Sequence, residues 1–104
     1  MANALFHPEA QEEFELALAW YRKRSLRAAQ GFDAEVERVL GLIGSRPKMF
    51  LKYDDDHRIA LLRKYPYSLI YQEYQGRLFV VAVAHASRQP DYWRGRSVDV
   101  PRDL

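Results

Sequence analysis

The feature that most constrains the fold is an uninterrupted apolar segment near the C-terminal end, Leu78-Phe79-Val80-Val81-Ala82-Val83-Ala84. Its length and its β-branched residues indicate a β-strand. Because apolar residues occupy both alternating faces, the strand is expected to be covered on both sides. The chain must therefore build a sheet in which this strand is central and protected from solvent.

Upstream of this segment the hydrophobic period changes once, from 3.6 residues to 2. Helical spacing of apolar residues predicts one helix that begins at Pro8 and a second that follows the N-cap candidate Ser25 and stops before Pro47. The region 45–57 is expected to be a loop. Strands are predicted at Leu5-Phe6 and over 58–63, 67–73 and 77–84.

This order, β-α-α-β-β-β, predicts an α+β fold in which the two N-terminal helices pack on one face of a small, mainly antiparallel sheet. With 104 residues, 48% of them hydrophobic and 29% charged, the chain is expected to form one soluble domain over 1–104. The absence of Cys excludes disulfides and thiolate metal sites and fits a cytoplasmic location. No apolar run approaches the roughly 18 residues of a membrane span. The net charge of +2 permits a nucleic-acid partner without requiring one.

Ionisable and aromatic side chains follow the apolar strand at once. His85, Arg88 and Tyr92 lie within the next eight residues, beside Trp93 and further arginines. A strand end is rigid at its base and open to solvent at its tip, which suits a site that acts on an anion such as nucleic acid.

Several motifs occur in a fixed order along the chain: Pro8-Glu9-Ala10, Trp20-Tyr21, Arg63-x-x-Pro66-Tyr67-x-x-x-Tyr71 and Ala84-His85-x-x-Arg88-x-Pro90-x-Tyr92-Trp93-x-x-Arg96. Together with the order of elements, they resemble the RelE/ParE toxin superfamily over nearly the whole chain. The resemblance implies a twisted antiparallel sheet under two helices. It also implies a cytoplasmic, bacterial toxin of a type II toxin–antitoxin (plasmid stabilisation) system, which a cognate antitoxin protein holds silent. RelE-like members cleave mRNA on the ribosome, whereas ParE-like members poison DNA gyrase.

The first functional hypothesis is a ribosome-dependent mRNA endoribonuclease that needs neither metal nor cofactor. His85 would act as acid or base, because its ordinary pKa near 6.5 allows both. Arg63 and Arg88 would clamp the scissile phosphate, since a guanidinium binds two oxygens at once. Tyr92 would stack on a base or donate a proton.

Two alternatives stay open at this point. One is a non-enzymatic gyrase poison that acts through a protein interface, and the other is a degenerate member that only binds its antitoxin. The best-known RelE-like nucleases carry several Lys on the central strands, and the predicted strands 67–73 and 78–84 carry none.

Each candidate residue also has a purely structural interpretation. His85 would hydrogen-bond a backbone carbonyl, Arg88 would pair with a carboxylate, and Arg63 would solvate a strand edge. Tyr92 and Trp93 would form a hydrophobic plug under the sheet.

Three other features are interpreted as structural. The arginines Arg94, Arg96 and Arg102 are expected in solvent. Trp20 is expected to pack the first helix against the sheet. Consecutive side chains in Asp54-Asp55-Asp56-His57 point in different directions, so this loop is not expected to bind a metal.

Overall fold

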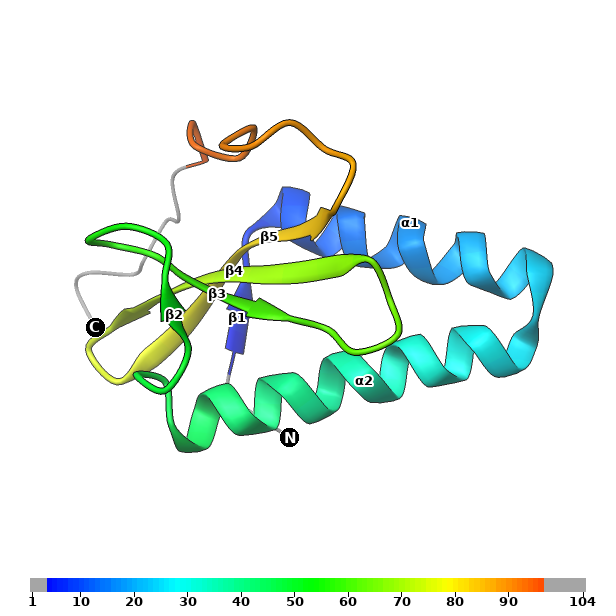
Figure 1. Cartoon of the computed structure of the whole chain (residues 1–104), viewed down its shortest axis with the longest axis horizontal. Coiled ribbons are helices and arrows are strands. Elements are labelled where there is room, and N and C mark those ends of the chain that lie inside the picture. Colours follow the sequence, from blue (N-terminus) through cyan, green and yellow to red (C-terminus); the bar gives the residue numbers. More distant parts are fainter. Residues whose placement is uncertain (1–3, 97–104) are drawn as a thin grey trace.

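The computed structural model describes residues 4–96, and Figure 1 shows a helical hairpin beside a curved sheet. The sheet has five strands in the order β1-β5-β4-β3-β2. β1 runs parallel to β5, and the other neighbours pair antiparallel. The α+β prediction, with two helices followed by a mainly antiparallel sheet, is therefore confirmed. The elements are β1 (Ala4–Phe6), α1 (Pro8–Arg24), α2 (Leu26–Ser45), β2 (Leu51–Lys52), β3 (Arg58–Leu61), β4 (Tyr67–Tyr74) and β5 (Arg77–His85).

Side-chain caps define where the helices begin. The His7 ring accepts a hydrogen bond from the backbone N–H of Glu9 at 3.1 Å, ahead of Pro8 at the first helical position. Ser25 is the residue between the helices, and its hydroxyl accepts from the N–H of Ala28 at 3.1 Å. One residue thus ends α1 and caps α2, which makes the hairpin turn tight.

One strand was not predicted. β2 lies inside the region 45–57 that was expected to be a loop, and it pairs Leu51 with Ile59 and Lys52 with Arg58. Two residues are too few to show an alternating period, so this edge strand leaves no recognisable sequence signal.

The apolar segment forms β5, which lies between β1 and β4 and is covered on both faces, as predicted. Ile70 pairs with Ala82 and Tyr71 with Val80, so Val81 is an extra residue that forms a bulge. One face packs against the helices in a core that includes Phe32, Val36, Ile43, Leu69 and Val80. The other face packs under Trp93 in a smaller core with Ile70, Val81 and Ala82.

Among residues 4–96, no helix combines the length and the apolar character that crossing a bilayer requires.

Candidate functional site

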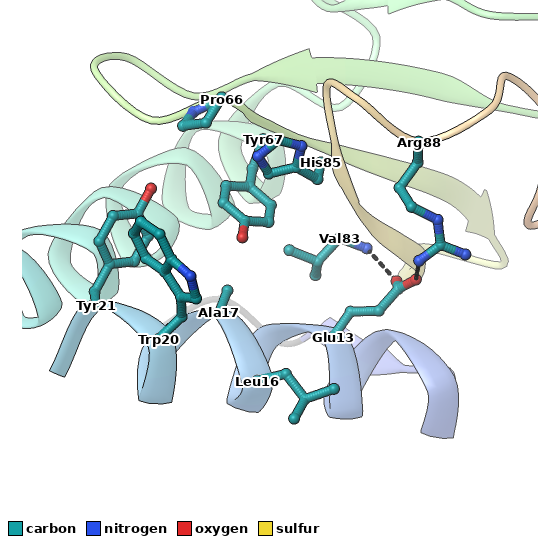
Figure 2. A pocket seen from close by; sticks show the side chains of 10 residues that line it. All are labelled: Glu13, Leu16, Ala17, Trp20, Tyr21, Pro66, Tyr67, Val83, His85 and Arg88. Atoms are coloured by element: carbon teal, nitrogen blue, oxygen red, sulfur yellow. Dashed lines mark hydrogen bonds and ion pairs between the residues drawn. The ribbon is translucent and has the colours of Figure 1, made fainter. Parts of the chain in front are cut away.

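A pocket of about 380 Å³ lies between α1 and the ends of β4 and β5. Figure 2 shows His85 and Arg88 on its strand side and α1 residues on the opposite side. Apolar groups cover much of its surface, and the charged groups gather at the Arg88 end. Its lining consists of Glu13, Leu16, Ala17, Trp20, Tyr21, Pro66, Tyr67, Val83, His85 and Arg88.

His85 occupies the last position of β5 and packs edge-on against Tyr67, with 4.9 Å between the ring centroids. Its Nδ1 accepts the backbone N–H of Ser87 at 2.9 Å, and the Ser87 hydroxyl lies 2.7 Å away. Since Nδ1 is an acceptor, the proton of the neutral ring resides on Nε2. The backbone partner is an N–H group and not the carbonyl that the structural interpretation expected.

Arg88 follows on the loop after β5, and its side chain is 52% exposed. Its guanidinium lies over the Tyr92 ring at 3.8 Å and is 3.9 Å from a carboxylate oxygen of Glu13. The structural interpretation predicted that Arg88 pairs with a carboxylate, and Glu13 in α1 provides that carboxylate. The same residue still faces the pocket.

Glu13 is the centre of a hydrogen-bond cluster that joins α1, β5 and the C-terminal segment. Its carboxylate accepts the Tyr92 hydroxyl at 2.7 Å, two N–H groups of Arg96 at 2.9 Å each, and the backbone N–H of Val83 at 2.9 Å. Burial alone would raise the pKa of Glu13, but these donors outweigh burial and hold it below its ordinary value. Glu13 is therefore a carboxylate at neutral pH.

Arg96 was expected in solvent, and this expectation is wrong. Its side chain is only 9% exposed, because the guanidinium bonds Glu13 and also donates to the carbonyl oxygen of Val81 at 3.0 Å. Tyr92 is bound in the same cluster, and burial together with its bond to Glu13 raises the pKa of its phenol. The phenol therefore keeps its proton and donates a hydrogen bond to the Glu13 carboxylate.

Arg63 lies in a different pocket, between α2 and the connection from β3 to β4. Its backbone N–H donates to Glu35 at 2.6 Å, and Glu35 also holds Arg38 through two hydrogen bonds. Arg63 follows β3 at the same end of the sheet, since Leu61 pairs with Ser68 and Ser68 with Ala84, but it lines this separate pocket and not the one that His85 and Arg88 line. Tyr92 contacts the His85 pocket through its bond to Glu13.

A family model described as "ParE toxin of type II toxin-antitoxin system, parDE" matches residues 4–90. The chain belongs to the ParE toxin family. The match includes His85 and Arg88 and ends before Tyr92 and Arg96. A search of curated proteins found no match. Membership of a type II toxin–antitoxin system implies that an antitoxin is the partner of this toxin.

The arrangement in this ParE-family toxin limits the chemistry available at the pocket. Nε2 of His85 makes no hydrogen bond within residues 4–96. Arg88, by contrast, shares its positive charge with Glu13, while Tyr92 and Arg96 are fully engaged by the same carboxylate. A phosphate at this end of the pocket would have to displace that anion.

A second polar cluster stabilises the opposite face of the sheet. Asp54 accepts hydrogen bonds from the His57 ring at 2.9 Å and from Arg94 at 2.8 Å. Arg94 is 47% exposed, as expected, and it has two carboxylate partners, since Asp91 lies 3.1 Å from it as well. Across residues 4–96, no group of three or more His, Cys, Asp or Glu side chains is arranged to hold a metal ion.

Two aromatic expectations have opposite outcomes. Trp93 is buried against Ile70 and Ala82, so the plug interpretation is confirmed for this residue. Trp20 was expected to pack against the sheet, but it is 50% exposed and lies beside the pocket under the guanidinium of Arg24. Arg102 lies outside the described residues.

Sequence reasoning missed Glu13 as a site residue. A signal for it was nevertheless available. Glu13 lies three residues after Ala10 and four before Ala17, which places it on the buried face of the helix. A carboxylate on that face needs a cationic partner, and Arg96 provides it.

Proposed function

We propose that this toxin inhibits DNA gyrase by binding it, without catalysing a reaction, and that residues 1–104 act as one toxin domain in the cytoplasm. The observation that carries the proposal is the Glu13 carboxylate. It binds Tyr92 and Arg96 and approaches Arg88, which are the groups that a phosphate would otherwise recruit.

Metal-independent RNA cleavage needs an acid, a base and cations aimed at the phosphate oxygens. Of the four residues suggested for these roles, Tyr92 is bound to Glu13 and Arg63 lines a separate pocket. His85 and Arg88 remain, and the Glu13 carboxylate beside Arg88 would repel a phosphate. The arrangement favours an inhibitor whose action depends on contact surfaces.

A ribosome-dependent mRNA endoribonuclease is the second candidate, because one observation favours it. His85 and Arg88 line the same pocket, and Nε2 of His85 has no hydrogen-bond partner among the described residues 4–96. In this candidate His85 would exchange the proton and Arg88 would clamp the phosphate. Arg63 and Tyr92 would then serve as contacts to RNA or to the ribosome.

The antitoxin is proposed to cover the pocket beside α1. Leu16 is 64% exposed and lies four residues before Trp20, so the two form a solvent-facing apolar stripe along its rim. Replacing Leu16 with Asp is expected to weaken capture of the antitoxin encoded beside the toxin. Leu51→Asp, at an equally exposed position on the edge strand β2, is the matched control and should leave capture unchanged.

The experiment that separates the two candidate functions combines two assays on one preparation. Purified toxin is tested for inhibition of DNA supercoiling by gyrase and, by primer extension, for mRNA cleavage in a translation system. The proposal expects inhibition of supercoiling and no cuts, with the His85→Ala/Arg88→Ala variant inhibiting as well as the wild type. Cuts that require ribosomes and disappear in this variant would favour the nuclease.

A further inference from the structure

The turn between α1 and α2 carries an unusual concentration of positive charge. Arg22, Lys23, Arg24 and Arg27, here called the basic tip, are all exposed. No Asp or Glu occurs between Glu15 and Asp33. The molecule is elongated, with extents of 42 × 28 × 25 Å, and Figure 1 shows this turn at one end of its longest axis.

Carboxylates in the part of the chain that the structure describes do not pair with the basic tip. None of its four residues forms an ion pair with another residue of the described range 4–96, whereas Arg38, Arg94 and Arg96 each do. Arg24 donates to the carbonyl oxygen of Trp20 and lies over its ring, so its charge stays close to the surface. The tip therefore presents four cations to solvent.

Helix stability explains only part of this cluster. Arg22, Lys23 and Arg24 lie in the last turn of α1, where the helix dipole favours cations. Arg27 lies in the first turn of α2, where the dipole favours acids, and that turn contains none. A cation in this position weakens the helix slightly, so its presence points to a role outside folding.

We infer that the basic tip binds the phosphate backbone of double-stranded DNA, so that the toxin contacts DNA as well as protein when it acts on gyrase. The inference rests on the proposed function. Four cations lie within about one turn of two adjacent helices, a span of roughly 10 Å. Duplex DNA carries one phosphate charge per roughly 1.7 Å of axis, so several phosphates lie within reach of such a surface.

A protein partner fits the basic tip less well. The core of a protein interface is apolar and depleted of charge. Between residues 22 and 27 the tip exposes one large apolar side chain, Leu26, and a single exposed apolar residue is ordinary for a protein surface. Trp20 lies under Arg24 of the tip, but the apolar stripe that it forms with Leu16 borders the pocket. Because contacts to phosphates carry no sequence information, the binding is expected to be independent of DNA sequence.

The salt dependence of binding gives a quantitative test. If all four cations contact phosphates, the affinity falls with a log–log slope of about −3.6, or roughly 150-fold between 50 and 200 mM salt. In the variant Arg22→Gln/Arg27→Gln the slope should be about −1.8, which corresponds to a loss of about 12-fold. Fluorescence anisotropy of a labelled duplex of about 25 base pairs, titrated with the full-length toxin, measures both.

The matched control is Arg46→Gln/Arg77→Gln, which removes the same net charge. Arg46 follows the C-terminal end of α2 and Arg77 begins β5, both at the opposite end of the molecule (Figure 1), and both are exposed. The control should keep the wild-type slope. Equal slopes in the two variants, or tighter binding to a single-stranded RNA or to polyglutamate than to the duplex, would overturn the inference.

Inhibition of supercoiling by the same variants separates this inference from the proposed function. If duplex binding depends on the basic tip but the toxin does not inhibit gyrase, the gyrase proposal is rejected and DNA binding by the basic tip is supported. If the toxin inhibits gyrase fully but does not bind the duplex, DNA binding by the basic tip is rejected and the gyrase proposal is supported. Circular dichroism of each variant checks that the helices persist.

Discussion

Removing the Glu13 carboxylate is predicted to destabilise the fold strongly, because three elements meet at this one group. The Glu13 side chain is 14% exposed and accepts four hydrogen bonds, from Tyr92, Val83 and twice from Arg96. In Glu13→Ala the Arg96 guanidinium, whose side chain is 9% exposed, loses its hydrogen-bonded carboxylate, and the remaining carboxylate near it in residues 4–96 is Glu9 at 3.9 Å. The loss of this close partner for a buried charge is the principal cost.

The magnitude follows from the geometry of the cluster. Removing one partner of a buried ion pair typically costs about 3–5 kcal/mol. Arg96 keeps its bond to the Val81 carbonyl, and the cluster has an open side toward Arg88, so about 2–4 kcal/mol is expected here. For a chain of this size, that free energy lowers Tm by roughly 10–20 °C. Glu13→Gln should lose less than Glu13→Ala, because the amide oxygen still accepts from Val83 or Tyr92.

Urea unfolding and thermal melting of Glu13→Ala, Glu13→Gln and Glu15→Gln measure these differences. Glu15 is the control because it is exposed on the same helix and, in the part of the chain that the structure describes, its side chain bonds only Gln11, so its substitution should cost about 0.5 kcal/mol or less. A Glu13→Ala variant that unfolds within 0.5 kcal/mol of the wild type would refute the description of this cluster.

Three further predictions follow from the contacts. The pKa of Glu13 is lowered on folding, so the stabilisation by its carboxylate is fully present above the unfolded pKa near 4.5 and is lost as the pH falls through the lower folded pKa. The urea midpoints of the wild type and of Glu13→Gln should therefore converge between pH 6 and pH 3. A difference that stays constant over this range would contradict the prediction. A Cβ on Gly31 would collide with the Tyr65 hydroxyl, so Gly31→Ala should cost about 1–3 kcal/mol, and a double-mutant cycle with Tyr65→Phe should recover most of it. Trp93→Ala should cost about 3–5 kcal/mol in a urea titration, because Trp93 covers Ile70 on the sheet face without helices; a loss below 1 kcal/mol would show that this core is not needed.

The fold was largely predictable because its signals are local. Helical spacing and the caps at Pro8 and Ser25 define the hairpin, and the apolar segment defines β5. β2 was missed because its two residues acquire strand geometry only through pairing with β3. That pairing is a long-range contact which no local pattern encodes.

The site was less predictable because its key contact spans the chain. Glu13 and Arg96 are 83 residues apart, and each has an ordinary solvent-exposed interpretation when read alone. His85 and Arg88 lie together because one strand end carries both. Arg63 was grouped with them by motif order, whereas the connection after β3 directs it toward α2.

Inhibition of DNA gyrase tests the central claim most directly. Purified toxin is titrated into a supercoiling reaction with relaxed plasmid, alongside the His85→Ala/Arg88→Ala variant. The account predicts that both proteins block supercoiling at similar concentrations. Undisturbed supercoiling at excess folded toxin, accompanied by ribosome-dependent mRNA cuts that the variant fails to make, would contradict it.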